Sequence, residues 1–76
     1  MKELLTFIAR NLVDEPDKVS VTERDGDNET VLELRVARGD MGKVIGRNGR
    51  IARDIRTLVR AAAQRRGERV SVDIKD

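Results

Sequence analysis

The chain opens with apolar residues at helical spacing that end close to a proline. The apolar positions are Leu5, Ile8, Ala9, Leu12 and Val13. This period predicts an amphipathic helix of about twelve residues. Pro16 disfavours helical backbone at the residue before it, so the helix should run no farther than about Glu15. Phe7 falls on the opposite side of the helix from Leu5, which leaves it either exposed at the edge of a small core or available to another chain.

Two stretches that follow alternate between apolar and polar residues, as half-buried strands do. In residues 18–23, Val19 and Val21 share one side, and in residues 29–37 the inward positions are Leu32, Leu34 and Val36. The stretch Asp25-Gly26-Asp27-Asn28 between them has the composition of a turn. We therefore predict an antiparallel hairpin, whose register the long turn leaves open.

The second half of the chain predicts a short helix, a long helix and a third strand. Gly39-Asp40 breaks the second strand and supplies an N-cap for a helical turn over residues 41–45, with Val44 and Ile45 inward. After Gly46-Arg47-Asn48-Gly49, a longer helix should run from Arg50 to about Arg66 and end at Gly67, a typical C-terminal cap. Its predicted inward positions are Ile51, Ile55, Leu58, Val59 and Ala62. Residues 69–75 alternate again, with Val70, Val72 and Ile74 on one side.

The element order is therefore α-β-β-α-α-β, in a single domain over residues 1–76. Two helices separate the second strand from the third, so a right-handed crossover that places them parallel and adjacent is the economical topology. The expected fold is α+β, a three-stranded mixed sheet with the helices packed on one face.

Composition argues against several classes of protein. The chain lacks cysteine, histidine, tryptophan and tyrosine, so it can form no disulfide or thiolate metal site and has no imidazole base. The carboxylates lie mostly in turns, and we expect no catalytic residues, no metal, no cofactor and no small-molecule substrate. No apolar run approaches the roughly 18 residues of a membrane span and no signal peptide opens the chain, so we expect a cytoplasmic protein without membrane contact.

Charge is unevenly distributed along the chain. Residues 1–40 carry six basic and ten acidic side chains, a net charge of −4, whereas residues 41–76 carry ten basic and four acidic ones, a net +6. An asymmetry of this kind favours a polyanionic partner for the second half.

The basic half contains the motif Gly46-Arg47-Asn48-Gly49 between two predicted helices. Glycine permits positive φ and lets another backbone approach without a Cβ in the way. The N–H groups and positive dipole end of the following helix would face such a ligand, and they suit a phosphate. Gly-x-x-Gly alone is a weak indication of function, because two glycines at this spacing occur by chance in many chains. The surrounding residues and elements are needed to interpret it.

With its flanking Val44-Ile45 and Ile51, and within this order of elements, the motif resembles that of the K-homology (KH) domain, whose Gly-x-x-Gly loop clamps about four nucleotides. A helix and a strand precede the core unit, as in the bacterial type II fold. The length and the stretches "DEPDKVSV" and "GDMGKVIGRNGRIARDIRTLVRAAA" resemble the KhpA family of small bacterial RNA-binding proteins.

The resemblance implies a partner and a biological role. It implies binding of single-stranded RNA with modest sequence preference, and work as an RNA chaperone or post-transcriptional regulator. It also implies a homodimer, or a heterodimer with a Jag-type (KhpB-like) KH protein, and a link to cell shape and cell wall homeostasis.

The resemblance also assigns residues. Gly46, Arg47, Asn48 and Gly49 would form the clamp, and Lys43 and Arg50 would contact phosphates. The bases would lie between the two helices and the second strand. Candidates for the apolar wall of this groove are Val36, Val44, Ile45 and Ile51, which could equally be core residues.

The other arginines of the long helix have a simpler interpretation. With Ile51 as the centre of the buried stripe, Arg53, Arg56 and Arg60 project away from the sheet and keep the helix solvated. Arg65 and Arg66 complement the negative end of the helix dipole. With a single aromatic residue to stack on bases, one domain should bind RNA weakly, at about micromolar affinity or worse.

Three alternative functions stay open. The chain could be a protein-interaction or dimerisation module in which the glycine loop is structural and Phe7 or the long helix docks another chain. DNA binding by a helix-turn-helix is less favoured, because the long helix must place its apolar stripe on the sheet. A nucleotide-binding enzyme is least favoured, since no Gly-Lys-Ser/Thr follows the glycines.

Overall fold

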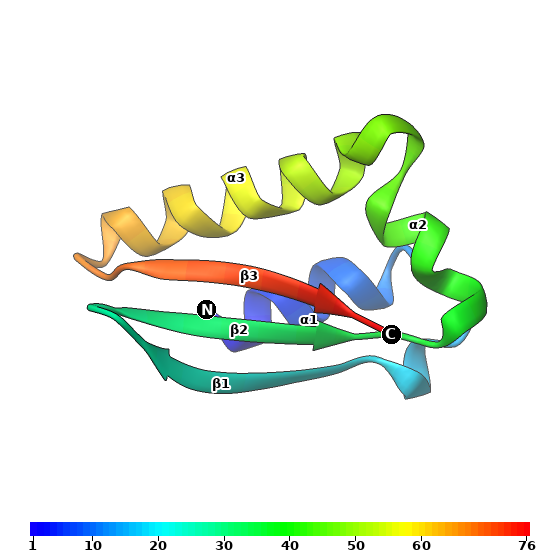
Figure 1. Cartoon of the computed structure of the whole chain (residues 1–76), viewed down its shortest axis with the longest axis horizontal. Coiled ribbons are helices and arrows are strands. Elements are labelled where there is room, and N and C mark those ends of the chain that lie inside the picture. Colours follow the sequence, from blue (N-terminus) through cyan, green and yellow to red (C-terminus); the bar gives the residue numbers. More distant parts are fainter.

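The computed structural model describes all residues, 1–76, as two layers, a sheet and the helices that cover it (Figure 1). The helices are α1 (Lys2–Arg10), α2 (Met41–Ile45) and α3 (Arg50–Arg65), and the strands are β1 (Ser20–Gly26), β2 (Glu29–Arg35) and β3 (Val70–Lys75). Single 3₁₀ turns lie at Pro16–Lys18, Arg38–Asp40 and Arg47–Gly49. The predicted order α-β-β-α-α-β is confirmed. No helix has both the length and the apolar character needed to span a membrane.

The sheet has the order β1-β2-β3, with β1 antiparallel and β3 parallel to β2. The predicted parallel, adjacent placement of the second and third strands is therefore confirmed. The β1–β2 register, which the sequence left open, runs from Ser20 opposite Arg35 to Gly26 opposite Glu29. The turn is thus only Asp27-Asn28, and Asn28 takes the left-handed conformation (φ 59°) that asparagine tolerates.

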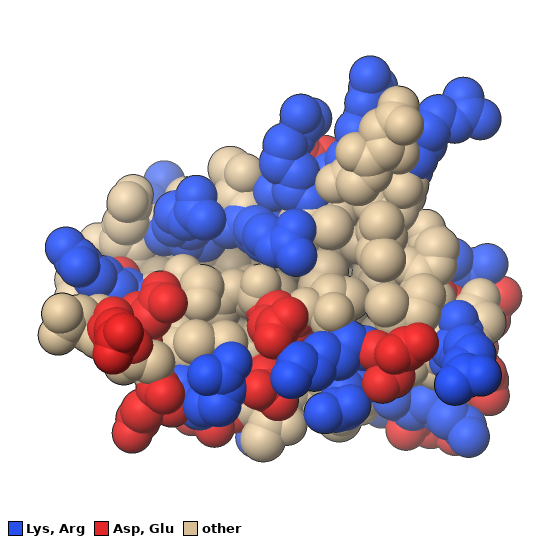
Figure 2. Space-filling view, viewed as in Figure 1, with Lys and Arg blue, Asp and Glu red and all other residues tan.

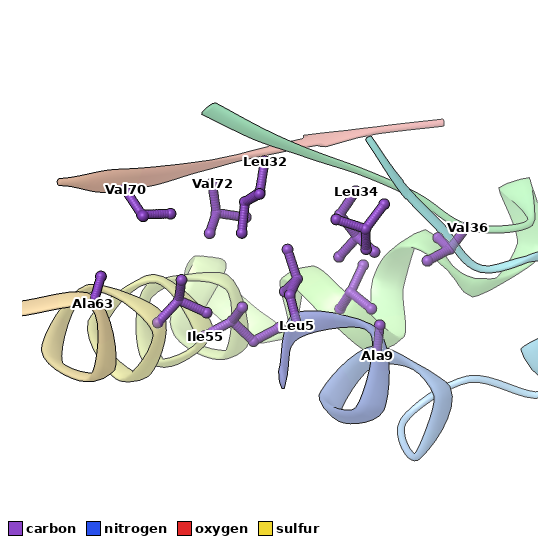
Figure 3. Close-up of a cluster of buried hydrophobic side chains, with 12 residues drawn as sticks. Leu5, Ala9, Leu32, Leu34, Val36, Ile55, Ala63, Val70 and Val72 are labelled. Atoms are coloured by element: carbon purple, nitrogen blue, oxygen red, sulfur yellow. The ribbon is translucent and has the colours of Figure 1, made fainter. Parts of the chain in front are cut away.

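The core lies between one face of the sheet and the helices α1 and α3 (Figure 3). Leu32 and Leu34 of the central strand are completely buried, as are Leu5 of α1 and Val59 of α3. Both helices pack on the same face, as the sequence predicted. The thin core matches what a chain of this length can bury.

The first helix is shorter than predicted, since it has nine residues rather than about twelve and ends at Arg10. Asn11 follows it, and both its backbone N–H and its side-chain amide donate to the carbonyl of Phe7, the amide at 2.8 Å. The backbone N–H groups of Asp14 and Glu15 then donate to the carboxylate oxygens of Asp40, at 3.1 and 3.0 Å. The segment after Arg10 is therefore held by a side chain 25 residues away, which helical period cannot reveal.

Asp40 occupies the predicted N-cap position of α2 but does not cap it. Its side chain makes no hydrogen bond to the N–H groups of α2. Asp40 is only 2% exposed, and its carboxylate accepts the bonds from the α1–β1 connection instead. A buried carboxylate must have such donors, because an unpaired one is costly.

The buried face of α3 is rotated relative to the prediction. Ala52, Ile55, Val59 and Ala63 are buried, whereas Leu58 is 56% exposed. Apolar residues on α3 form two adjacent stripes, and the sequence alone favoured the one with the larger side chains. The end of α3 was predicted correctly: Gly67 has φ 71°, and the N–H groups of Gly67 and Glu68 bond the carbonyls of Gln64 and Ala63, as in a Schellman cap.

The sheet face opposite the helices carries an ion-pair network centred on Glu33. The Glu33 carboxylate accepts a 2.7 Å bond from Arg24 Nε, and Lys75 Nζ lies 3.6 Å from the same oxygen. The hydrogen bond from Arg24, and then the charge of Lys75, hold the pKa of Glu33 below the ordinary value of 4.5.

A lowered carboxylate pKa predicts loss of stability in acid. The contribution of Glu33 should be complete above pH 4.5, the pKa of an unperturbed glutamate, and disappear as pH falls through the lowered pKa of the folded protein. We expect Glu33→Gln to melt below the wild type at pH 7 and to approach it as the pH falls below 4.5. Thermal melts across this range measure the effect, and a constant gap between the two proteins would contradict it.

Candidate nucleic-acid interface

The segment from Gly46 to Gly49 makes a sharp turn between α2 and α3, at one end of the molecule (Figure 1). Three of its four residues have positive φ: 76° at Gly46, 58° at Asn48 and 73° at Gly49. Gly46 combines this φ with ψ 176°, a conformation open essentially to glycine alone. Asparagine tolerates the left-handed region better than most residues, which accounts for Asn48.

The two glycines meet different surroundings. A Cβ added to Gly46 would lie 2.6 Å from Cγ1 of Ile51, so the side chain of Ile51 fills the space beside Gly46. A Cβ added to Gly49 would meet nothing within 4 Å. Gly46 is therefore needed to close the loop onto α3, whereas the space beside Gly49 is open to a ligand.

The N-terminus of α3 remains electropositive. Its N-cap is Gly49, which has no side chain with which to bond the first-turn N–H groups. The first turn contains no acidic residue, although acidic side chains are favoured there by the helix dipole. An anion beside Gly49 would supply the missing negative charge.

Two basic side chains at the loop are without partners in the chain. Arg47 and Arg50 are exposed, and the six ion pairs of the structure include neither. Lys43, the third predicted phosphate ligand, differs, since its Nζ lies 3.2 Å from Asp14 Oδ2. Basic side chains predominate over α3 and the loop in Figure 2, whereas basic and acidic ones are intermixed over the strands below. The structure thus brings Lys43, Arg47 and Arg50 to one end of the molecule, with Lys43 partly neutralised.

The predicted apolar wall is only partly accessible. Val36 and Val44 belong to the core cluster and are buried, and Ile51 packs against the same cluster. Ile45 was expected to point inward, but it is 37% exposed and so can contact a ligand. The five-residue helix α2 buries Val44 alone, because consecutive helical residues lie about 100° apart.

The strand beside α3 is β3 rather than β2. Both edges of β2 are paired, one with β1 and the other with β3. The outer edge of β3 has no neighbouring strand. The groove was predicted between the helices and the second strand, but the free backbone edge near α3 belongs to β3.

The arginines of α3 do not all point away from the sheet. Arg53 is well exposed and lies 3.8 Å from its neighbour Asp54. Arg56 instead donates from Nε to the carbonyl oxygen of Val72 on β3, at 3.3 Å. Arg60 lines a small hollow of about 170 Å³ with Glu29 and Arg69. These placements of Arg56 and Arg60 were not predicted, because the buried stripe of the helix was expected to centre on Ile51.

The structure holds no cluster of three or more histidine, cysteine, aspartate or glutamate side chains that could ligate a metal. The loop and its flanking residues offer backbone N–H groups, guanidinium groups, one ammonium group and one amide. Such a set binds anions.

Comparison with known proteins identifies similar chains. A family model described as KhpA/KhpB, KH domain, matches residues 2–74. The RNA-binding protein KhpA of Clostridium acetobutylicum is 55% identical over 97% of this chain and 99% of its own length. The protein of that name from Chlamydia trachomatis is 46% identical over all of this chain and 97% of its own.

Solved structures of Era share the fold. Era in complex with MgGDPNP and nucleotides 1506–1542 of 16S ribosomal RNA matches with a TM-score of 0.69 at 22% identity, over 96% of this chain. Aquifex aeolicus Era Y63A bound to GDP·AlF4⁻ matches with a TM-score of 0.66, also at 22% identity. This chain spans 28% of either Era chain, so the likeness concerns one part of Era and its fold only. The predicted type II KH fold is confirmed.

Proposed function

The chain belongs to the KhpA/KhpB KH-domain family, and from this premise we propose that it binds single-stranded RNA without catalysing a reaction, with the Gly46–Gly49 loop as the clamp on the RNA backbone. The observation that carries the proposal is the open space beside Gly49 at an uncapped, electropositive helix N-terminus. The name RNA-binding protein KhpA, borne by relatives that match nearly the whole chain, supports RNA as the polyanion.

Each part of the loop has a role in this proposal. The bare backbone at Gly49 lets the sugar-phosphate chain approach, and the first-turn N–H groups of α3 donate to a phosphate. Arg47 and Arg50, which have no acidic partner, add charge-assisted hydrogen bonds. Lys43 adds a further ion pair to the RNA when a phosphate replaces Asp14 as its partner, and Ile45 offers aliphatic contact to a base.

A salt titration tests the proposal. If the loop neutralises two or three phosphates, a plot of log affinity against log salt should have a slope of about −1.4 to −2.1 for single strands. Fluorescence anisotropy with a labelled single-stranded RNA of about ten nucleotides gives this slope. A slope near zero, or equal affinity for a double-stranded RNA of the same length, would reject the clamp.

The biological role follows the resemblance. We propose that the protein acts in the cytoplasm as an RNA chaperone or post-transcriptional regulator, with effects on cell shape and cell wall homeostasis. Crosslinking in cells, followed by sequencing of the attached RNA, tests the first part of this role. Recovery of no RNA above the level of an Arg47→Asp/Asn48→Asp variant would contradict it.

A second candidate function, self-association or pairing with a Jag-type KH protein, is favoured by one surface. Phe7 is 67% exposed and Leu58 is 56% exposed, and both line a shallow hollow of about 810 Å³ between α1 and α3. The other lining residues are Met1, Leu4, Ile8, Ala61, Ala62, Arg65 and Arg66. Exposed apolar surface of this kind is typical of interaction sites.

Sedimentation tests the interaction function separately from RNA binding. We expect Phe7→Ser and Leu58→Ser to shift a wild-type dimer toward monomer, while Leu12→Ser, a change at an exposed leucine outside this hollow, leaves it intact. A wild type that stays monomeric up to about 100 μM, alone and with a Jag-type protein, would exclude this function. A dimer that retains no RNA would favour it over RNA binding.

A further inference from the structure

The outer edge of β3 presents backbone groups that nothing else in the sheet uses. In a parallel pair, every second residue directs both its N–H and its C=O toward the neighbouring strand. The N–H of Thr30 bonds the carbonyl of Arg69, so Arg69, Ser71 and Asp73 face β2. Val70, Val72 and Ile74 therefore direct their N–H and C=O groups to the free edge.

One of these edge groups is already occupied. Arg56 Nε donates to the carbonyl of Val72 at 3.3 Å, and Val72 is the middle residue of the three. This is the hydrogen bond by which α3 reaches across to the strand. The guanidinium group of Arg56 therefore occupies the Val72 carbonyl, the central acceptor of the edge, whereas the edge N–H groups remain available as donors.

Arg56 also lies close to the proposed clamp. It is six residues beyond Arg50, which corresponds to about 9 Å along the axis of α3. The helix and β3 lie side by side in Figure 1, joined by the turn at Gly67. An uncharged band of surface separates the basic side chains of α3 and the loop from the charged strands in Figure 2. A nucleotide whose phosphate sits at the loop can thus place its base near Val72.

We propose that Arg56 is a specificity-determining residue for RNA, because its bond to the Val72 carbonyl competes with a base amino group for the central acceptor of the β3 edge. This inference rests on the proposed RNA-binding function. The edge still donates from its N–H groups, which all bases can satisfy with ring nitrogens or carbonyls. With its central acceptor occupied by Arg56, the edge is expected to discriminate weakly among bases.

Removal of the guanidinium group should create base discrimination. Arg56→Met keeps an apolar stem of similar length but donates no hydrogen bond, so it frees the Val72 carbonyl. The matched control is Arg53→Met, which removes the same charge from an exposed residue whose guanidinium group pairs only with its neighbour Asp54. The ligands are an oligoadenylate of about ten nucleotides and the same oligomer built from purine riboside, which lacks the amino group.

We expect the wild type and Arg53→Met to bind the two oligomers within about twofold of each other, and Arg56→Met to prefer adenosine by about threefold to tenfold, the worth of one net hydrogen bond. An unchanged ratio in Arg56→Met would overturn the proposal. If affinity then falls equally for both oligomers and the salt slope weakens by about 0.7, Arg56 contacts a phosphate instead. A wild type that binds neither oligomer would overturn the proposed function, and this inference with it.

Discussion

The double substitution Arg47→Asp/Asn48→Asp is expected to lower affinity for single-stranded RNA by about 100-fold or more while the protein stays folded. The change removes an unpaired guanidinium group from the loop and places two carboxylates where the phosphates would lie. Each lost charge-assisted hydrogen bond is worth about a factor of ten or more, and repulsion adds to it. Aspartate, like asparagine, tolerates the left-handed backbone of residue 48, which has φ 58°.

A matched control keeps this test specific to the loop. Arg10→Asp/Asn28→Asp makes the same change in net charge, and Asn28 has the same left-handed backbone as Asn48, with φ 59°. Arg10 ends α1, and Asn28 lies in the β1–β2 turn, so neither belongs to the loop. Circular dichroism and anisotropy should find both variants folded and only the loop variant deficient in binding. Equal losses in the two variants would point to net charge rather than a clamp.

The fold was accessible from the sequence because local signals agree along most of this chain. Alternating residues marked the three strands, and Gly67 marked the end of α3 at a left-handed position. The parallel placement of β2 and β3 followed from the two helices between them. The glycines of the loop were identified for the same reason, since their positive φ values are a local property of the backbone.

The errors arise where distant residues decide the structure. The Asp40 carboxylate accepts hydrogen bonds from the backbone N–H groups of Asp14 and Glu15, 26 and 25 residues away. These bonds hold the segment that follows the shortened α1, and the carboxylate does not cap α2 as predicted. Which of the two apolar stripes of α3 is buried depends on how close α3 lies to β3. The stripe that contains the small residues Ala52 and Ala63 is buried, and Leu58 of the other stripe is exposed. The same rotation turned Arg56 toward Val72, which no pattern in the sequence indicated.

These errors change the description of the site more than that of the fold. The predicted clamp residues Gly46 to Gly49 lie in one loop between α2 and α3, and the strand edge without a neighbouring strand belongs to β3 rather than β2. Of the candidates for the groove wall, Val36 and Val44 are buried in the core, which is the alternative that the sequence left open, and Ile45 is exposed. The basic residues near the loop also differ in their ion pairing, because Lys43 pairs with Asp14 whereas Arg47 and Arg50 have no acidic partner.

The two loop glycines should separate stability from binding. Gly46→Ala places a Cβ 2.6 Å from Ile51 Cγ1 in a conformation that only glycine adopts readily. Overpacking and backbone strain each cost about 1 to 3 kcal/mol, so we expect a loss of about 3 kcal/mol. For a domain of this size, that loss lowers the melting temperature by about 12 to 24 °C. Thermal melts by circular dichroism measure it.

Gly49→Ala should lower RNA affinity more than it lowers stability. Its Cβ meets no atom of the protein within 4 Å, so the cost is the left-handed backbone alone, about 1 to 2 kcal/mol. The methyl group occupies the space where the RNA backbone would approach, and we expect affinity to fall by about tenfold or more in a variant that remains folded. Gly42→Ala is the control, because Gly42 lies inside α2 with open space around it, and alanine there should raise stability slightly. If Gly49→Ala binds RNA as tightly as the wild type, the ligand does not pass beside Gly49, and the loop serves only to join α2 to α3.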